Sequence, residues 1–225
     1  SNDPMGVYIK DFGLPKIEFD CTALDNDRID TVSREYLTFT IVYNLLLKSI
    51  KDIGDDLLNL RIQKIYTMIN KYSINPGYPN IVNLQELISA IEQSKEFYRM
   101  YYIDYLTNGF VERNPDELAL PFLYLESFIS KYKQVLNNNS YFGIIIDKSE
   151  DIAPSSTKAV NNLVGSRINK DISIKIIVEP GMWDSYVTSN GQHVDSVHDY
   201  GTVELDGSHG QYIKRLSREN TIMPR

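Results

Sequence analysis

Four charged residues directly follow a short apolar run in the second half of the chain. The run is residues 142–146, FGIII, and after it come Asp147, Lys148, Glu150 and Asp151. Short apolar runs with β-branched residues are typical of strands buried on both faces, as in a parallel sheet. Ligands of open α/β sheets bind at the carboxyl ends of the strands. An acid at this point therefore predicts a contact with a ligand or a metal ion.

Two kinds of chemistry fit these acids. A hydrophobic strand that ends in aspartate is how P-loop nucleotidases hold Mg²⁺, usually through water, and Asp147 has that place. Asp147 and Glu150 also fit an acid/base pair in an α/β enzyme of another kind, for which the sequence names no substrate.

Other candidate sites are weaker. Histidines and aspartates gather near the C-terminus, but their irregular spacing and missing cysteines favour solvated loop residues over a metal site. They are His193, Asp195, His198, Asp199 and His209. Cys21, the only cysteine, belongs to no catalytic motif.

Composition excludes several classes of protein. The chain has 225 residues, enough for one large domain or two small ones, and a formal net charge of −7. This charge argues against a broad electrostatic footprint on nucleic acid or an anionic membrane. One cysteine permits no internal disulfide, and the chain has no run of 18 apolar residues. We therefore expect a cytoplasmic protein that does not enter membranes.

The elements that position the acids follow from periodicity and punctuation. We expect strands at 6–10, 142–146, 172–178 and 202–205, and helices at 31–53, 57–72, 83–105, 114–136, 155–168 and 211–218. Strand, helix and strand between 142 and 178 form a right-handed parallel crossover. Residues 31–136 are then a helical insertion on an α/β sheet. The helix at 31–53 is apolar on nearly every side, which predicts burial between layers.

Three features have both a functional and a structural interpretation. Tyrosines at 98, 101, 102 and 105 could stack nucleic-acid bases, but aromatic residues at helical spacing are more often core or partner interface. Lys214, Arg215 and Arg218 fit arginine-finger roles at a subunit boundary, yet we favour solvated residues of a terminal helix. Trp183 is expected to anchor its loop.

Several segments, in order, resemble one group of proteins. They are FGIIIDKSEDI at 142–152, AVNNLV at 159–164, IKI at 174–176 and HDYGTVEL at 198–205. The set resembles bacterial P-loop ATPases related to the AAA+ proteins of the origin recognition complex. In that group a Walker B strand precedes an acidic segment, a Val-Asn-x-Leu helix, a strand and a late Asp-Tyr. GVYI at 6–9 looks like their second strand, and the resemblance spans about 6–215, most densely 141–206.

The resemblance implies roles for individual residues, with ATP and Mg²⁺ as cofactors. Asp147 matches the Walker B aspartate, which orients magnesium and its water shell. Lys148 stands where these ATPases have the glutamate that polarises the attacking water, and a lysine does not accept that proton at neutral pH. Glu150 matches a family acid that partly compensates as the catalytic residue, and Glu179 lies where a nucleotide-contacting sensor would sit.

One family motif is missing from the sequence. No Gly-x-x-x-x-Gly-Lys-Ser/Thr occurs in the sequence. We therefore expect a single α/β domain of P-loop NTPase type over 1–225 that lacks the P-loop strand. Within it, residues 137–218 would run from the Walker B strand to the last core strand and the helix after it. The chain is then part of a longer ATPase or a descendant that lost the loop. We expect a partial or degenerate nucleotide-binding core with negligible ATP hydrolysis. The alternative is a catalytically silent scaffold. In either case we expect homo-oligomers or a protein partner bound through 31–136.

Overall fold

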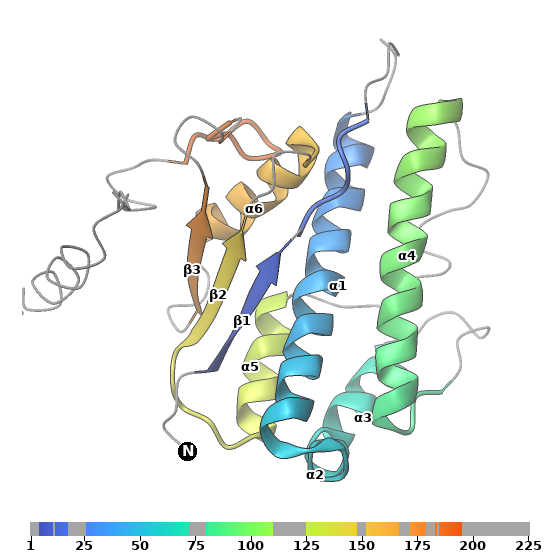
Figure 1. Cartoon of the computed structure of the whole chain (residues 1–225), viewed down its shortest axis with the longest axis vertical. Helices are drawn as coiled ribbons and strands as arrows, with labels where there is room; N and C mark the ends of the chain where they lie inside the picture. The colour runs from blue at the N-terminus through green and yellow to red at the C-terminus, as the bar shows by residue number, and fades with distance from the viewer. Residues whose placement is uncertain are drawn as a thin grey trace, which may run out of the picture. The chain divides into compact units, whose positions relative to one another are not determined.

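A computed structural model of the whole chain describes residues 5–10, 12–17, 26–72, 80–109, 125–147, 152–166, 172–178, 183 and 185–194. The described residues form three strands and six helices in the order β1, α1 to α5, β2, α6, β3 (Figure 1). None of the described helices has both the length and the apolar character needed to cross a bilayer. The strand predicted at 202–205 and the helix predicted at 211–218 lie outside the described residues.

The three strands form one parallel sheet. β1 (Met5–Lys10), β2 (Phe142–Asp147) and β3 (Ile172–Ile177) lie side by side in that order, so β2 is the central strand (Figure 1). The predicted crossover between β2 and β3 is confirmed, because α6 (Pro154–Ser166) joins these two parallel strands. The expected α/β class is therefore confirmed.

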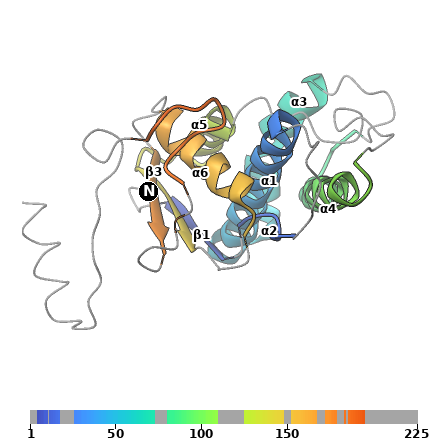
Figure 2. The same ribbon diagram turned by 90° about the horizontal axis from the view of Figure 1, so that it is seen from above.

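The two faces of the sheet differ in how they are covered. On the inner face, five side chains of β1 and β2 are at most 3% exposed: Val7, Ile9, Phe142, Ile144 and Ile146. On the outer face Tyr8 is 53% and Ile177 42% exposed. In β2 itself, Gly143 and Ile145 point to this face and are only partly buried, so the prediction that 142–146 is buried on both faces is wrong for the outer face. Right-handed crossovers that step across a sheet in one direction place their helices on one side, and the described helices lie on that side (Figure 2).

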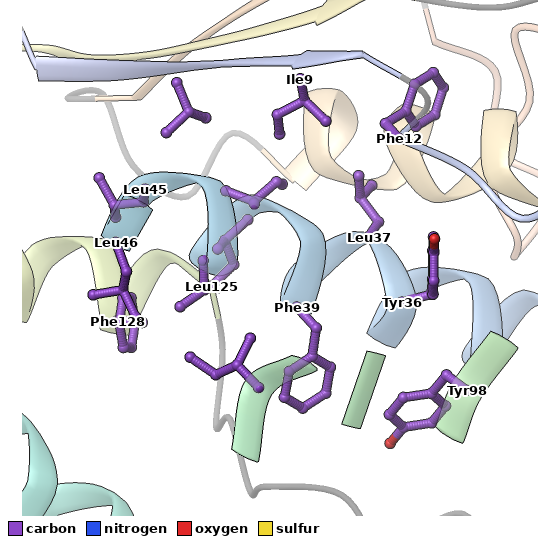
Figure 3. Close-up of a cluster of buried hydrophobic side chains, with 14 of the residues drawn as sticks. Ile9, Phe12, Tyr36, Leu37, Phe39, Leu45, Leu46, Tyr98, Leu125 and Phe128 are labelled. Atoms are coloured by element: carbon purple, nitrogen blue, oxygen red, sulfur yellow. The ribbon is translucent and has the colours of Figure 1, made fainter. Parts of the chain in front are cut away.

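The longest helix, α1 (Asn26–Ile53), lies between the sheet and α4 (Leu84–Asn108). Figure 3 shows Leu37 on the side of α1 that faces the strand and Phe39 on the side that faces α4. The ring centroids of Phe39 and Tyr98 of α4 are 5.7 Å apart. A helix in this position has no wide solvent-facing stripe, so it needs apolar residues on both sides. The prediction that this helix is buried between layers is confirmed.

The helix predicted at 57–72 is in fact two helices. α2 (Asp55–Arg61) ends at Arg61 with Ile62 as its C-cap, and α3 (Gln63–Tyr72) begins directly after that residue. Ile62 has φ −91° and ψ 8°, and the amide of Ile65 donates to its carbonyl oxygen at 2.8 Å, which marks a tight turn. The apolar spacing continues through this turn, so periodicity alone does not reveal the break.

α4 begins at the predicted N-cap, Asn83, but the returning bond of the predicted capping box goes to Val82, the residue before the cap. The amide of Glu86 donates to Oδ1 of Asn83 at 2.8 Å, and the amide of Val82 donates to Oε2 of Glu86 at 2.8 Å. Within the helix predicted at 114–136, the structure describes α5 (Leu125–Val135), and residues 110–124 lie outside the described part.

The tyrosine-rich face of α4 belongs to the core. Tyr98, Tyr101, Tyr102 and Tyr105 are each at most 6% exposed. The guanidinium carbon of Arg28 lies 5.7 Å from the ring centroids of both Tyr101 and Tyr105, within cation–π range. The core interpretation is confirmed. The base-stacking interpretation is wrong for these four residues, because their rings are not accessible.

Phe39→Ala is expected to lower the free energy of unfolding by about 3–5 kcal/mol, because it opens a cavity between α1 and α4. Phe39 is 0% exposed, whereas Met100 on α4 is 43% exposed, so Met100→Ala is a control expected to change stability far less. Urea unfolding followed by circular dichroism measures both variants. A loss of less than about 1 kcal/mol for Phe39→Ala would contradict this packing.

Candidate functional site

Asp147 lies at the carboxyl end of the central strand. In the register of the sheet its neighbours are Lys10 of β1 and Ile177 of β3. The alternation of β2 puts its side chain on the outer face, where it is partly exposed. The predicted location of this acid, at the carboxyl edge of a parallel sheet, is therefore confirmed. Its role as a metal-orienting group stays a prediction.

A tyrosine of the neighbouring strand holds the Asp147 carboxylate. The hydroxyl of Tyr8 donates a hydrogen bond to Oδ2 of Asp147. Tyr8 pairs in register with Ile145, so it reaches Asp147 diagonally, two residues further along β2. The sequence alone does not point to Tyr8, since only the register between β1 and β2 reveals which residue of β1 lies near the acid.

The other predicted site residues lie outside the described part of the chain. Glu150 and Lys148 follow β2, and Glu179 follows β3. Their roles as catalytic acid, substituted glutamate and nucleotide-contacting sensor stay predictions. Of the histidines considered for a metal site, only His193 is described, and it forms an isolated antiparallel bridge with Val187.

The residues near Asp147 can be compared with what magnesium requires. The described residues include no group of three His, Cys, Asp or Glu side chains that could hold a metal ion. Mg²⁺ in nucleotide sites, however, keeps several waters and binds one or two carboxylates together with phosphate oxygens. Asp147 fits as the single carboxylate of such a site, and the described residues do not build a protein-only cage.

The chain after β1 is tied to the start of α6. The amide of Leu14 donates to Oγ of Ser156 at 2.9 Å, and the amide of Ala153 donates to the carbonyl oxygen of Leu14 at 2.9 Å. A Cβ on Gly13 would lie 2.4 Å from Cγ2 of Ile152, so this close approach requires glycine. These contacts fix the start of α6 against the segment that follows the carboxyl end of β1.

A family model for ORC-CDC6-like proteins matches residues 4–219, nearly the whole chain. The chain belongs to the ORC-CDC6-like family. The resemblance to proteins related to the origin recognition complex, drawn from the segments between 142 and 205, is thereby confirmed, while the bacterial origin of the group stays a prediction. No curated protein and no solved structure matches the chain. Membership makes this chain a relative of AAA+-like ATPases, which in general use ATP with Mg²⁺.

In this ORC-CDC6-like chain, two adjacent asparagines of α6 hold segment 185–194. Nδ2 of Asn161 donates to the carbonyl oxygens of Ser185 and Val187 at 2.7 and 2.9 Å. Nδ2 of Asn162 donates to Oγ of Ser189 at 2.7 Å, and its Oδ1 accepts from the amide of Ser189 at 2.9 Å. The AVNNLV segment therefore has a structural task, which is to dock the chain that follows β3 onto α6.

Trp183 takes part in the same contact. Its indole Nε1 donates to Oδ1 of Asn161 at 3.3 Å, and its ring packs against the core. The prediction that Trp183 anchors its loop is confirmed. The role of the asparagine pair was not predicted, although two side-chain amides inside an apolar helical segment are a signal for it, because buried amides need hydrogen-bond partners.

A partly buried ion pair joins α1 to α6 beside this contact. Nζ of Lys158 lies 3.4 Å from Oδ2 of Asp30, which is 6% exposed. Burial raises the pKa of the Asp30 carboxyl above its ordinary value, and the Lys158 ammonium offsets that effect only in part. The folded protein thus binds the Asp30 proton more tightly than the unfolded chain does.

This difference predicts how stability depends on pH. A raised pKa in the folded state contributes stability that is fully present below the ordinary value of 3.8 and is lost as pH rises through the folded-state pKa. Asp30→Asn removes this titration. The free energy of unfolding of the parent minus that of Asp30→Asn is expected to fall as pH rises from acid to neutral, measured by urea unfolding at several pH values. A difference that stays constant or rises with pH would contradict a raised pKa of the Asp30 carboxyl in the folded protein.

Proposed function

We propose that this chain is a partial or degenerate nucleotide-binding core of an AAA+-like ATPase that hydrolyses ATP negligibly by itself. The observation that carries the proposal is the position of Asp147 at the carboxyl end of the central parallel strand, in a chain of the ORC-CDC6-like family. Ligands of open α/β sheets gather at this edge. Asp147 would be the acid that orients Mg²⁺, and the ion would offset the charge of the ATP phosphates.

The sequence next to Asp147 supports negligible hydrolysis. Lys148 replaces the glutamate that polarises the attacking water, and its positive charge opposes a nearby metal ion. Glu150 is the remaining candidate acid, two residues from the usual place. The 225 residues also contain no Gly-x-x-x-x-Gly-Lys-Ser/Thr motif, whose backbone amides and lysine bind phosphates. Glu179 completes the proposed nucleotide contacts.

ATP is expected to bind weakly and to bind more tightly with Mg²⁺ than without it, because the metal links its phosphates to Asp147. Asp147→Asn is expected to remove the magnesium-dependent part of the affinity and to leave binding without the metal unchanged. Calorimetry with and without Mg²⁺ measures this, and a phosphate-release assay is expected to stay at background. ATP turnover that disappears in Asp147→Asn would contradict the inactive assignment. Identical affinities with and without Mg²⁺ would contradict the role of Asp147.

A catalytically silent protein-interaction module is the second candidate. Exposed aliphatic residues in the helical block, residues 31–136, favour it: Leu57, Leu60 and Val82 are 41%, 64% and 61% exposed. Leu57 and Leu60 share one face of α2, and Asn59 of α2 accepts from the amide of Leu84, two residues after Val82. In this second candidate, these exposed aliphatic side chains would contact another copy or another protein.

If the second candidate holds, the parent is expected to show a mass above that of the monomer, and Leu60→Glu is expected to reduce it, since a charge there opposes burial. Size-exclusion chromatography with light scattering measures this. Lys64→Glu, also in an exposed position of the helical block, is the control for added negative charge. A monomeric parent would contradict self-association through this cluster.

A further inference from the structure

Tyr8 and Asp147 meet on the face of the sheet that the described helices leave uncovered. The phenol hydroxyl of Tyr8 donates to Oδ2 of Asp147 across the β1–β2 pair. We propose that Tyr8 is a positioning residue, which fixes the orientation of the Asp147 carboxylate for the magnesium–nucleotide complex. The inference deepens the proposed function and rests on it.

The geometry of the strand pair explains why a tyrosine performs this task. Asp147 lies in register with Lys10, and Tyr8 lies two residues before Lys10 on the same face. A diagonal neighbour in a sheet is about 7–8 Å away, so only a long side chain spans the gap. The Tyr8 ring is 53% exposed and is therefore not part of the buried core.

The chemistry of the donor matters as well as its reach. A tyrosine hydroxyl is an uncharged donor, so it orients a carboxylate and leaves its negative charge in place. The second oxygen of the carboxylate and the unused lone pairs still accept bonds from metal-bound water. Lys10 would instead neutralise the acid, and the ion pairs among the described residues include none between Lys10 and Asp147.

The test compares Tyr8→Phe with the parent by two measurements. The first is the ¹³C resonance of the Asp147 carboxyl group at one fixed pH without ligand. The second is the ratio of ATP affinities with and without Mg²⁺. Tyr141→Phe is the matched control, because it makes the same chemical change at a 70% exposed tyrosine beside the opposite, amino-terminal end of β2.

Tyr8→Phe is expected to move the Asp147 resonance and to lower the magnesium-dependent affinity ratio about three- to tenfold, as expected for one hydrogen bond. ATP affinity without Mg²⁺ is expected to stay unchanged, and Tyr141→Phe should match the parent in both measurements.

Two results would overturn the inference alone. An unmoved resonance would show that the contact does not form, and a moved resonance with an unchanged ratio would make Tyr8 merely structural. A parent without any effect of Mg²⁺ on ATP affinity would instead remove the proposed function, and the inference with it. Failure of the proposed function is thus distinguishable from failure of the inference.

Discussion

The pairing of β1 with β2 is the constraint on which the rest of the structure depends. Met5 pairs with Phe142 and Lys10 with Asp147, although helices α1 to α5 separate the two strands in sequence. A slip of one residue would turn Ile9 outward and Tyr8 inward, because side chains alternate along a strand. The buried inner row therefore fixes the register. The same register brings the Tyr8 hydroxyl to Asp147, so the packing of the core determines the geometry at the carboxyl edge.

The Asp147 carboxylate lies on the outer face of the sheet, the face that the described helices leave uncovered (Figure 2). Parallel sheets covered on both faces have nearly continuous apolar strands, whereas this sheet carries polar side chains on its outer face. These include Tyr8, Lys10, Asp147, Ser173 and Lys175. The helices meanwhile bury the inner face, and α1 is itself packed between the sheet and α4 (Figure 3). The structure thus separates an apolar side, which provides stability, from a side that carries polar and charged residues, Asp147 among them.

The sequence predicts the elements better than it predicts how they meet. Apolar runs locate β2 and β3, and the asparagine at 83 locates the start of α4, because these signals are local. The turn at Ile62 cannot be predicted from periodicity, since the apolar spacing continues through it. The partial exposure of the outer face was not predicted for another reason. Gly143 and Ile145 belong to an apolar run, and only the path of the crossovers decides which face of the sheet the described helices cover. The Tyr8 contact depends on pairing between distant segments, which no local pattern encodes.

The electrostatics around Asp147 decide what the acid can do. A lysine follows it in the sequence, and Lys10 is its neighbour in the register. Two unit charges 4 Å apart interact by about 1–4 kcal/mol in partly hydrated surroundings, so an ammonium bound to this carboxylate would compete strongly with a metal ion. A neutral hydroxyl contributes roughly 1 kcal/mol as a hydrogen bond and leaves the charge available. The Tyr8 hydroxyl in contact with Asp147 therefore leaves the negative charge of the carboxylate available, whereas an ammonium bound there would offset it.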